Sequence, residues 1–366
     1  MKVSEVNIHR VQIPLRHSFS QSNNSSVLSD STIVEVITAN RCSGFGESCP
    51  RLYVTGEDFT TVSNAIQTIE NHLKDTVFDN VYDIRNYVME DLLTQTGPAA
   101  STAIELALLD AWSKEQQTSI NRMMGATLPD CVFYSGVVPM RSPEATAQVM
   151  QLISRIQFPE LKLKIDGDLN ANLARIMAIR DVFPLQVPLR VDVNCAWSWE
   201  DAMTQIPLLL QQGITVFEQV FPSDQVEEMA RLQRYFDDDI CLMADESLTT
   251  LDSALRLVRS GACKRFNLKI SKHGGLFNTL EIYHLAQENG ISCQLGAHFG
   301  ETRILTAAGL VFTGLARNLT ALEGGLGTLL LEYDLSEIPL QINSSAAISK
   351  PEELLNSPGW GVEAVL

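Results

Sequence analysis

Long apolar runs are missing from this sequence of 366 residues, although 45% of its residues are hydrophobic. No stretch approaches the roughly 18 uninterrupted apolar residues that a membrane-spanning helix needs. Residues 1–19 mix charged and apolar side chains and lack the apolar centre of a signal peptide. We therefore expect no membrane span and no secretory signal, and we expect a cytoplasmic protein.

Positive charge is scarce as well. The chain has 27 Lys and Arg against 44 Asp and Glu, which gives a formal net charge of −17. Such a surface repels phosphate backbones and anionic lipids, which argues against nucleic acid and membranes as partners. The seven cysteines never form a C-x-x-C pair, so we expect reduced thiols rather than a disulfide framework.

Residues 1–50 alternate between apolar and polar side chains with a period of two, which predicts a short antiparallel sheet. Residues 17–32 interrupt this pattern with Ser and Asn, and we expect them to be disordered or to form a mobile lid. From residue 57 to 114 the apolar period lengthens to about 3.6, which predicts helices. Residues 1–130 are therefore predicted to form an α+β domain.

Eight apolar strand candidates, separated by helical stretches, follow from residue 131. Their centres lie near residues 135, 163, 191, 217, 243, 268, 294 and 321. Each interval accommodates one strand, one helix and two loops, and eight such units close into a parallel (β/α)8 barrel over residues 131–331. A doubly wound open sheet is the alternative, but its glycine-rich dinucleotide turn is missing. We expect the tail, residues 332–366, to pack back on the N-terminal domain.

Ionisable side chains close five consecutive strand candidates at the end where barrel enzymes build their active sites. Because alternate residues share a face of a strand, Lys162 and Lys164 are predicted to point together into the barrel, as are Asp192 and Asn194. The next three strands end in single ionisable residues, namely Glu218, Asp245 and Lys269.

Asp192, Glu218 and Asp245 end neighbouring strands, so we expect their carboxylates to converge. Crowded carboxylates repel one another unless a cation lies among them, and all-oxygen ligation suits Mg²⁺ or Mn²⁺. Lys164 and Lys269 end strands on opposite sides of the ring, so they would flank a small molecule held at the metal. A metal on the substrate carboxylate and a lysine base together favour removal of the α-proton through an enediolate.

Taken together, these residues resemble the enolase superfamily, in particular its muconate-lactonizing-enzyme subgroup. In the barrel, the resemblance rests on Lys162-x-Lys164, Asp192-x-Asn194, Glu218, Asp245-Glu246-Ser247 and Asn267-Leu268-Lys269-x-x-Lys272-x-Gly274-Gly275. In the N-terminal part, it rests on Gly44-x-Gly46-Glu47, Val54-Thr55-Gly56-Glu57 and Ala103-Ile104-Glu105-Leu106-Ala107. The resemblance thus covers almost the whole chain.

The resemblance implies an α/β fold with a modified (β/α)8 TIM-type barrel beneath an N-terminal α+β capping domain. It implies Mg²⁺ on the three carboxylates and Lys164 and Lys269 as acid/base catalysts. Lys162 would bind the substrate carboxylate or adjust the pKa of Lys164. Asn194 and Lys272 would support the ligands and lysines without contacting the substrate.

Family members with this lysine pair carry out several reactions on carboxylates. Two lysines on opposite faces of the substrate favour racemisation or epimerisation of an N-acylamino acid, a dipeptide or a proline derivative. Cycloisomerisation and an o-succinylbenzoate-synthase type of dehydration are the alternatives within the family, which also implies a homo-oligomer. A non-catalytic carboxylate-binding barrel and a Schiff-base aldolase are alternatives of a different class.

The last two strands suggest the substrate contacts. Dipeptide epimerases usually carry Asp-x-Asp at the end of the eighth strand, where this chain has Glu323 as the only carboxylate. The seventh strand ends with His298 and Glu301, and mandelate racemase pairs such a His with an Asp on the sixth strand, where this chain has Lys269. We interpret His298, Glu301 and Glu323 as substrate-binding residues. A hydrogen-bonded pair at the barrel rim is the other interpretation of His298 and Glu301.

Overall fold

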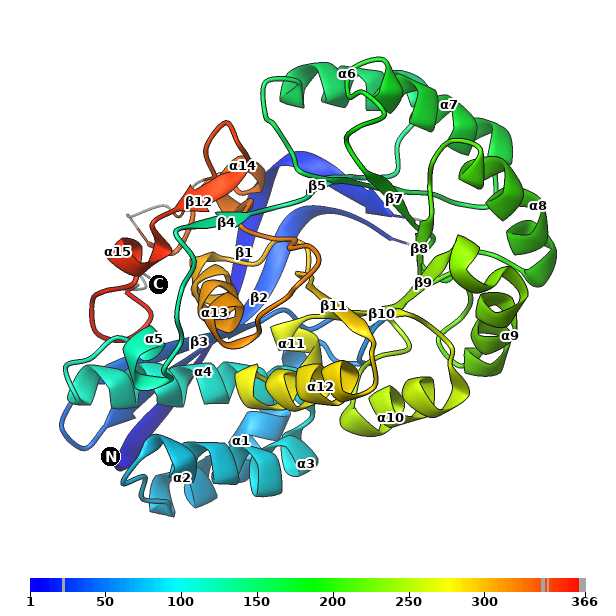
Figure 1. Ribbon diagram of the computed structural model, residues 1–366. Coiled ribbons are helices and arrows are strands. Elements are labelled where there is room, and N and C mark those ends of the chain that lie inside the picture. The colour runs from blue at the N-terminus through cyan, green and yellow to red at the C-terminus, as the bar shows by residue number, and fades with distance from the viewer. Residues whose placement is uncertain (22–23, 337–339, 341, 362–366) are drawn as a thin grey trace.

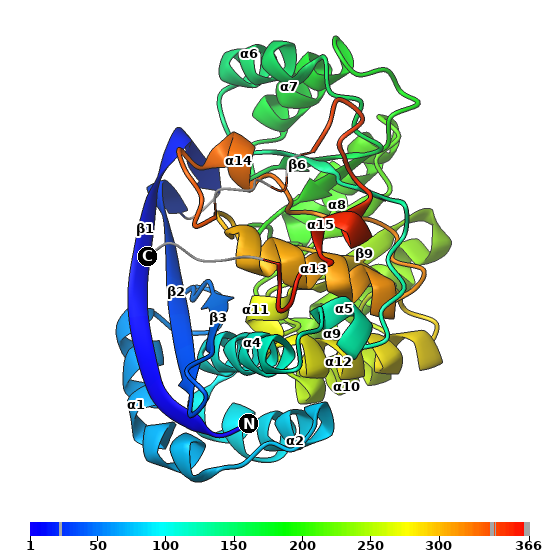
Figure 2. The same cartoon turned by 90° about the vertical axis from the view of Figure 1, so that its left-hand side faces the viewer.

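The computed structural model describes residues 1–21, 24–336, 340 and 342–361. A three-stranded antiparallel sheet opens the chain, with the strands β1 (Val3–Gln21), β2 (Asn24–Thr38) and β3 (Ser43–Ser48). The helical elements that follow it are α1 (Phe59–Asp75), α2 (Val81–Asn86), the π-helical turn η1 (Tyr87–Leu92), α3 (Leu93–Thr96), α4 (Pro98–Glu115) and α5 (Ile120–Met123). Figure 2 shows the long β1–β2 hairpin running along one side of the molecule.

The described part of residues 17–32 forms paired strands, so the expectation of a disordered segment is wrong there, and the mobile lid stays a prediction. Backbone pairing between β1 and β2 extends as far as Gln21 and Asn24, with a register shift between Pro14 and Phe19. The polar side chains do not prevent this, because Ser29 and Ser31 are buried and their hydroxyls donate to partners elsewhere in the fold. Residues 22–23 lie outside the described residues.

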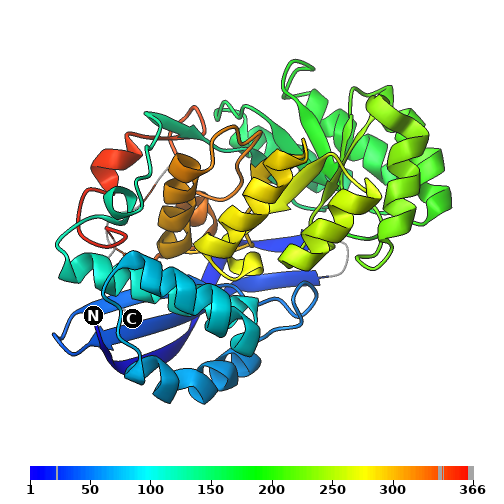
Figure 3. The same ribbon diagram turned by 60° about the horizontal axis from the view of Figure 1, so that its bottom comes forward.

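Helix α4 forms the centre of the N-terminal part. It lies between the antiparallel sheet and the barrel helices α11 (Ile270–His273) and α12 (Leu276–Glu288), as Figures 2 and 3 show. Strand β3 approaches it so closely that a Cβ atom added at Gly46 would lie 2.0 Å from the carbonyl oxygen of Ala103. Only glycine fits this contact, which gives a packing reason for the Gly44-x-Gly46 motif.

Seven parallel strands form the barrel wall (Figure 1). They are β5 (Gly136–Val138), β6 (Leu161–Lys164), β7 (Leu189–Asp192), β8 (Val216–Glu218), β9 (Cys241–Ala244), β10 (Arg265–Leu268) and β11 (Ser292–Leu295). The first seven predicted strand centres fall inside these strands or one residue away from them. The regular spacing of apolar runs therefore located the wall of the barrel correctly.

The eighth strand, predicted near residue 321, is reduced to a parallel bridge between Leu295 and Leu322. The amide of Leu295 donates to the oxygen of Ala321 at 3.1 Å, and the amide of Ser135 donates to the oxygen of Leu322 at 2.7 Å. Extended backbone stops soon afterwards, because Gly324 has a positive φ of 98°. The bridge still joins the last strand to the first, so the modified (β/α)8 barrel is confirmed.

Helices cover the outside of the barrel (Figure 1). The long helices are α12, already described, and α6 (Pro143–Ile153), α7 (Leu169–Arg180), α8 (Trp199–Leu210), α9 (Val226–Phe236), α10 (Leu251–Ser260) and α13 (Arg303–Leu315). The short elements are η2 (Asp237–Asp239), α14 (Gly327–Leu330), α15 (Pro351–Leu354), β4 (Cys131–Phe133) and β12 (Ala347–Ser349). None of the helices in the described ranges combines the length and apolar character needed to cross a bilayer.

The described part of the tail contacts both halves of the molecule. Strand β12 pairs with β4 at the start of the barrel. The amide of Trp360 donates to Asp110 Oδ1 of α4 at 2.9 Å, and its indole donates to the oxygen of Leu106 at 3.0 Å. The domain boundaries at residues 130 and 331 stay predictions.

The contact between β3 and α4 generates a prediction about stability. Gly46→Ala should lower the free energy of unfolding by about 3 kcal/mol, because the atom that a Cβ would meet belongs to helix backbone and cannot swing away. Gly167→Ala is the matched control, since a Cβ there meets no atom within 4 Å. Urea unfolding followed by circular dichroism measures both, and equal stability of the two variants would contradict the packing argument.

Candidate active site

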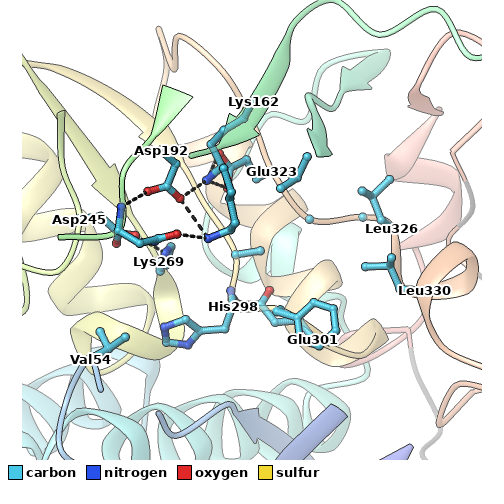
Figure 4. A pocket seen from close by; sticks show the side chains of 18 of the residues that line it. Val54, Lys162, Asp192, Asp245, Lys269, His298, Glu301, Glu323, Leu326 and Leu330 are labelled. Atoms are coloured by element: carbon cyan, nitrogen blue, oxygen red, sulfur yellow. Dashed lines mark hydrogen bonds and ion pairs between the residues drawn. The ribbon is translucent and has the colours of Figure 1, made fainter. Parts of the chain in front are cut away.

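A cavity opens at the C-terminal ends of the barrel strands, and most of the predicted site residues line it (Figure 4). The space between these side chains amounts to about 820 Å³ when the open solvent at its mouth is included. The predicted residues in its lining are Lys162, Lys164, Asp192, Asn194, Asp245, Lys269, His298, Glu301 and Glu323. Glu218 and Lys272 are fully buried among the other charged groups of the site.

Strand β6 brings two lysines to the inside of the barrel, as the alternation of its residues predicts. Its end pairs with β7, so Lys164 lies beside Asp192. The Lys164 ammonium donates to Asp192 Oδ2 at 3.1 Å and to Asn194 Oδ1 at 2.7 Å. Burial lowers the pKa of Lys162, but the nearby carboxylates of Glu218 and Glu323 outweigh this effect and hold that pKa well above its ordinary value. Lys162 is therefore a cation.

Three carboxylates end neighbouring strands, and all three are almost inaccessible: Asp192 is 1% exposed, Glu218 0% and Asp245 3%. Burial raises the pKa of Glu218 to about 8, with a further contribution from the negative charge of Asp192. Burial acts in the same direction on Asp245, but the ammonium groups of Lys269 and Lys272 hold its pKa well below the ordinary value. This cluster of negative charge therefore depends on cations close to it.

Two lysines supply that charge from the side of β10. The Lys269 ammonium donates to Asp245 Oδ2 at 2.6 Å, and the Lys272 ammonium donates to Asp245 Oδ1, also at 2.6 Å. Burial lowers the pKa of Lys269, but the carboxylate of Asp245 overcomes this and raises it above the ordinary value. Lys272 also donates to the backbone oxygens of Asp245 and Asn267, so its ammonium is fully used within the fold.

The three carboxylates have the chemistry of a magnesium site, since hard oxygen donors suit Mg²⁺. Within the described residues, however, no three His, Cys, Asp or Glu side chains lie close enough together to hold one ion. Lysine ammonium groups take both oxygens of Asp245 instead. The donor chemistry therefore fits Mg²⁺, while in this structure the ammonium groups of Lys269 and Lys272 are the partners of the Asp245 carboxylate.

Glu323 enters the barrel from the bridge that closes it, and cations of the barrel surround it. Its Oε2 accepts from the Lys162 ammonium at 2.8 Å, and its Oε1 accepts from the Arg190 guanidinium at 2.5 Å. The Gln294 amide donates to Oε1 at 3.3 Å. Burial alone would raise the pKa of Glu323, but Lys162 and Arg190 lower it to about 2.

Arg190 was missed by the sequence analysis, although the signal for it was present. It stands two residues before Asp192, so the alternation that pointed Asp192 inward also points Arg190 inward. Its guanidinium is 1% exposed and pairs with Glu160 as well as with Glu323. Arg190 thus anchors Glu323, which in turn holds Lys162.

His298 and Glu301 lie on the loop after β11 (Figure 4). The His298 side chain is buried, and neither of its ring nitrogens has a hydrogen-bond partner. The backbone amide of His298 donates to Glu301 Oε1 at 2.6 Å, so the hydrogen bond between the two residues does not involve the imidazole. Burial raises the pKa of Glu301 to about 8, which favours the neutral acid near pH 7.

Residues of the N-terminal sheet and of the segment after it hold this loop in place. Ser29 on β2 donates to the oxygen of Gly300 at 2.5 Å, and the guanidinium of Arg51 donates to the oxygen of Phe299 at 2.6 Å. Glu47 on β3 accepts from the amide of Thr302 at 2.9 Å. These three residues carried no such signal in the sequence, because their partners lie more than 240 residues further along the chain.

Comparisons with known proteins agree with this geometry. The family model described as enolase C-terminal domain-like matches residues 144–365. A hydrophobic dipeptide epimerase of Enterococcus faecalis is 28% identical, over 87% of this chain and 89% of the relative. An L-Ala-D/L-Glu epimerase of Bacillus subtilis is 26% identical, over 99% and 97%. An N-succinyl-L-Arg/Lys racemase of Bacillus cereus is 25% identical, over 88% and 87%.

Solved structures agree as well. The substrate-liganded complex of the L-Ala-D/L-Glu epimerase from Bacillus subtilis has a TM-score of 0.87 and 27% identity, with full coverage of both chains. The dipeptide epimerase from Enterococcus faecalis complexed with Mg and L-Leu-L-Tyr has a TM-score of 0.88 and 25% identity, over 99% of this chain and 100% of that one. The predicted resemblance and fold class are thus confirmed.

The network around Glu323 generates a prediction about acid stability. A carboxyl whose pKa is lower in the folded than in the unfolded chain stabilises the fold above its ordinary pKa and loses that effect as the pH falls toward 2. Glu323→Gln should therefore lower the free energy of unfolding by about 3 kcal/mol near pH 7, and this deficit should shrink toward pH 2.

Urea titrations at a series of pH values measure the deficit. Glu227→Gln is the matched control, because Glu227 forms an exposed pair with Arg256 and its loss should leave stability unchanged. A deficit for Glu323→Gln that stays constant from pH 7 to pH 2 would show that the pKa of Glu323 is the same in the folded and the unfolded chain.

Proposed function

Because the chain belongs to the enolase C-terminal domain-like family and is an isomerase of the enolase superfamily, we propose that it racemises or epimerises a carboxylate substrate with the help of Mg²⁺. The substrate we propose is an amino-acid derivative whose α-proton is removed and returned. The observation that carries this proposal is the placement of Lys164 and Lys269 on strands of opposite sides of one barrel, both lining the same cavity.

The placement of Lys164 and Lys269 on opposite sides of the barrel suits inversion of configuration at the α-carbon of the substrate. In the strand order of the wall, β7, β8 and β9 separate β6 from β10, and these three strands carry the carboxylates. A substrate held over the carboxylates would present one face to Lys164 and the other to Lys269. One lysine would take the α-proton as a neutral amine, and the other would return a proton to the opposite face as an ammonium.

The carboxylates would hold the ion and the remaining charges would position the lysines. We propose Asp192, Glu218 and Asp245 as the ligands of Mg²⁺, which when bound would stabilise the negative charge that develops on the substrate carboxylate. Asn194 orients the ammonium of Lys164 through its Oδ1 atom. Lys162, fixed by Glu323, would contribute a permanent positive charge beside Lys164. Lys272 donates a hydrogen bond to Asp245 Oδ1 and so would hold this carboxylate in position.

The two lysines can be tested separately by proton exchange in heavy water. Lys164→Met and Lys269→Met should each abolish interconversion of the enantiomers of N-acylamino acids or dipeptides, with kcat reduced at least a thousandfold. Each variant should still exchange the α-proton of the one enantiomer whose proton faces the remaining lysine. Proton NMR follows both reactions.

Lys264→Met is a suitable control, because Lys264 lies on the surface beside Asp238. If a single-lysine variant still interconverts the enantiomers at the rate of the parent protein, the two-base arrangement is wrong. If the parent protein exchanges no α-proton in any member of the panel, the proposed function itself fails.

The proposed ion site is tested by thermal unfolding as well as by activity. Adding Mg²⁺ at about 100 times its Kd to the chelator-treated protein should stabilise the fold by about 2.7 kcal/mol and restore activity. Asp245→Asn should weaken the Mg²⁺-dependent rise in Tm, because the amide removes one ligand charge. Asp238→Asn, on the surface, should leave that rise unchanged. A rise in Tm that is identical in Asp245→Asn and the parent protein would exclude Asp245 as a ligand.

A further inference from the structure

The far side of the cavity from the carboxylate cluster contains polar groups that the proposed proton transfer does not use. We infer that His298 and Glu301 form a subsite for an uncharged amide group of the substrate, so that the substrate carries no ammonium beside the reacting amino acid. This inference rests on the proposed function and specifies the chemical class of its substrate.

The inference begins with the carboxylates that line the cavity, because a substrate ammonium would need one of them as its partner. They are Asp192, Asp245, Glu246, Glu301 and Glu323. Asp192 and Asp245 belong to the proposed ion site. Glu246 lies with them on the same side, beside Asn194, whose amide donates to its Oε1, while its Oε2 has no hydrogen-bond partner within the described residues. Among the described residues, two carboxylates then line the end of the cavity formed by the last two strands, namely Glu301 and Glu323.

Glu323 is already neutralised by the barrel. Lys162 and Arg190 contact its two oxygens, and both cations are more than nine-tenths buried. A substrate ammonium would have to join a carboxylate that two permanent cations already surround, and it would be repelled by both. Glu323 is therefore part of the fold's own ion network rather than a receptor for a positive group.

Glu301 does not supply the missing negative charge either. Its side chain is buried, one of its oxygens accepts from the amide of His298, and burial raises its pKa to about 8. Near pH 7 the neutral acid predominates, and a neutral carboxyl group can donate a hydrogen bond to a carbonyl oxygen. Lys269 and the guanidinium of Arg51 add positive potential around it.

His298 is a polar residue of the cavity lining whose side chain has no hydrogen-bond partner within the described residues. It is 6% exposed, it lines the cavity, and both of its ring nitrogens lack hydrogen bonds. Burial and the positive charge of Lys269 hold its pKa well below the ordinary value, so the ring is neutral. A neutral imidazole offers one donor and one acceptor, which matches the carbonyl oxygen and the N–H of an amide.

A matched pair of substrates isolates the charge in question. An L-alanyl-L-amino acid and the corresponding propanoyl-L-amino acid differ only in the ammonium group of the alanyl unit. We expect kcat/KM for exchange of the α-proton in heavy water to be at least about tenfold higher for the propanoyl compound, for Leu, Phe, Lys and Glu as the reacting residue. The measurement uses the full chain with Mg²⁺.

Two substitutions then test the subsite itself. His298→Phe should reduce kcat/KM for the propanoyl compounds about tenfold or more, because an aromatic ring remains but both hydrogen-bonding nitrogens are lost. His298→Asn should recover part of that loss, since an amide side chain can both donate and accept. Arg256→Met is the control, because Arg256 on α10 is exposed and pairs with Glu227 on α9, on the outside of the barrel. Unchanged Tm values would show that the variants are folded.

The outcomes separate this inference from the proposed function. Faster exchange of the propanoyl compounds, together with sensitivity to His298→Phe and partial recovery in His298→Asn, supports the subsite. Equal or faster exchange of the alanyl compounds overturns the inference and leaves the racemase or epimerase proposal intact. Equal activity of His298→Phe and the parent protein also overturns it. No exchange with either series overturns the proposed function, and the inference with it.

Discussion

At the barrel mouth, the negative charge of several buried carboxylates is compensated by the positive charge of buried lysines. Neither set is stable alone in a low-dielectric interior, because an unpaired buried charge costs several kcal/mol. Asp245 shows this most clearly, with one ammonium on each of its oxygens. In the proposed function, a divalent ion on Asp245 would replace one of these ammonium groups as the partner of that carboxylate. Charge compensation in the fold and the proposed proton transfer would then use the same side chains.

The regular parts of this architecture are readable from the sequence. The repeat of apolar runs follows from the fixed length of one strand, one helix and two loops, so it located seven strands of the wall. The alternation of side chains along a strand is equally local, and it predicted that Lys162 and Lys164 share the inner face. Helix α1 is a similar case, since Val62, Ile66, Ile69 and Leu73 are buried along one face as their spacing requires.

Other features depend on partners that are distant in the sequence. The polar residues of β2 suggested a loop, because nothing nearby indicates that Ser29 would meet Gly300. Arg190 and Glu323 are 133 residues apart, and only the closed ring makes them neighbours. The eighth strand was expected at full length, but the glycines after Glu323 end it early. Local sequence patterns therefore do not predict long-range polar contacts or the positions where the conformation of a single residue ends a strand.

Glu47 shows how strongly the two halves of the molecule depend on each other. It sits on the N-terminal sheet, yet it accepts from the amides of Thr302 and Leu305 and so completes the first turn of α13 in the barrel. A chimera that joined this barrel to the sheet of a distant relative would therefore need to supply the same carboxylate at the same place. Grafting experiments that treat the barrel as an independent module would remove backbone contacts from the segment that follows His298, although every barrel residue had been kept.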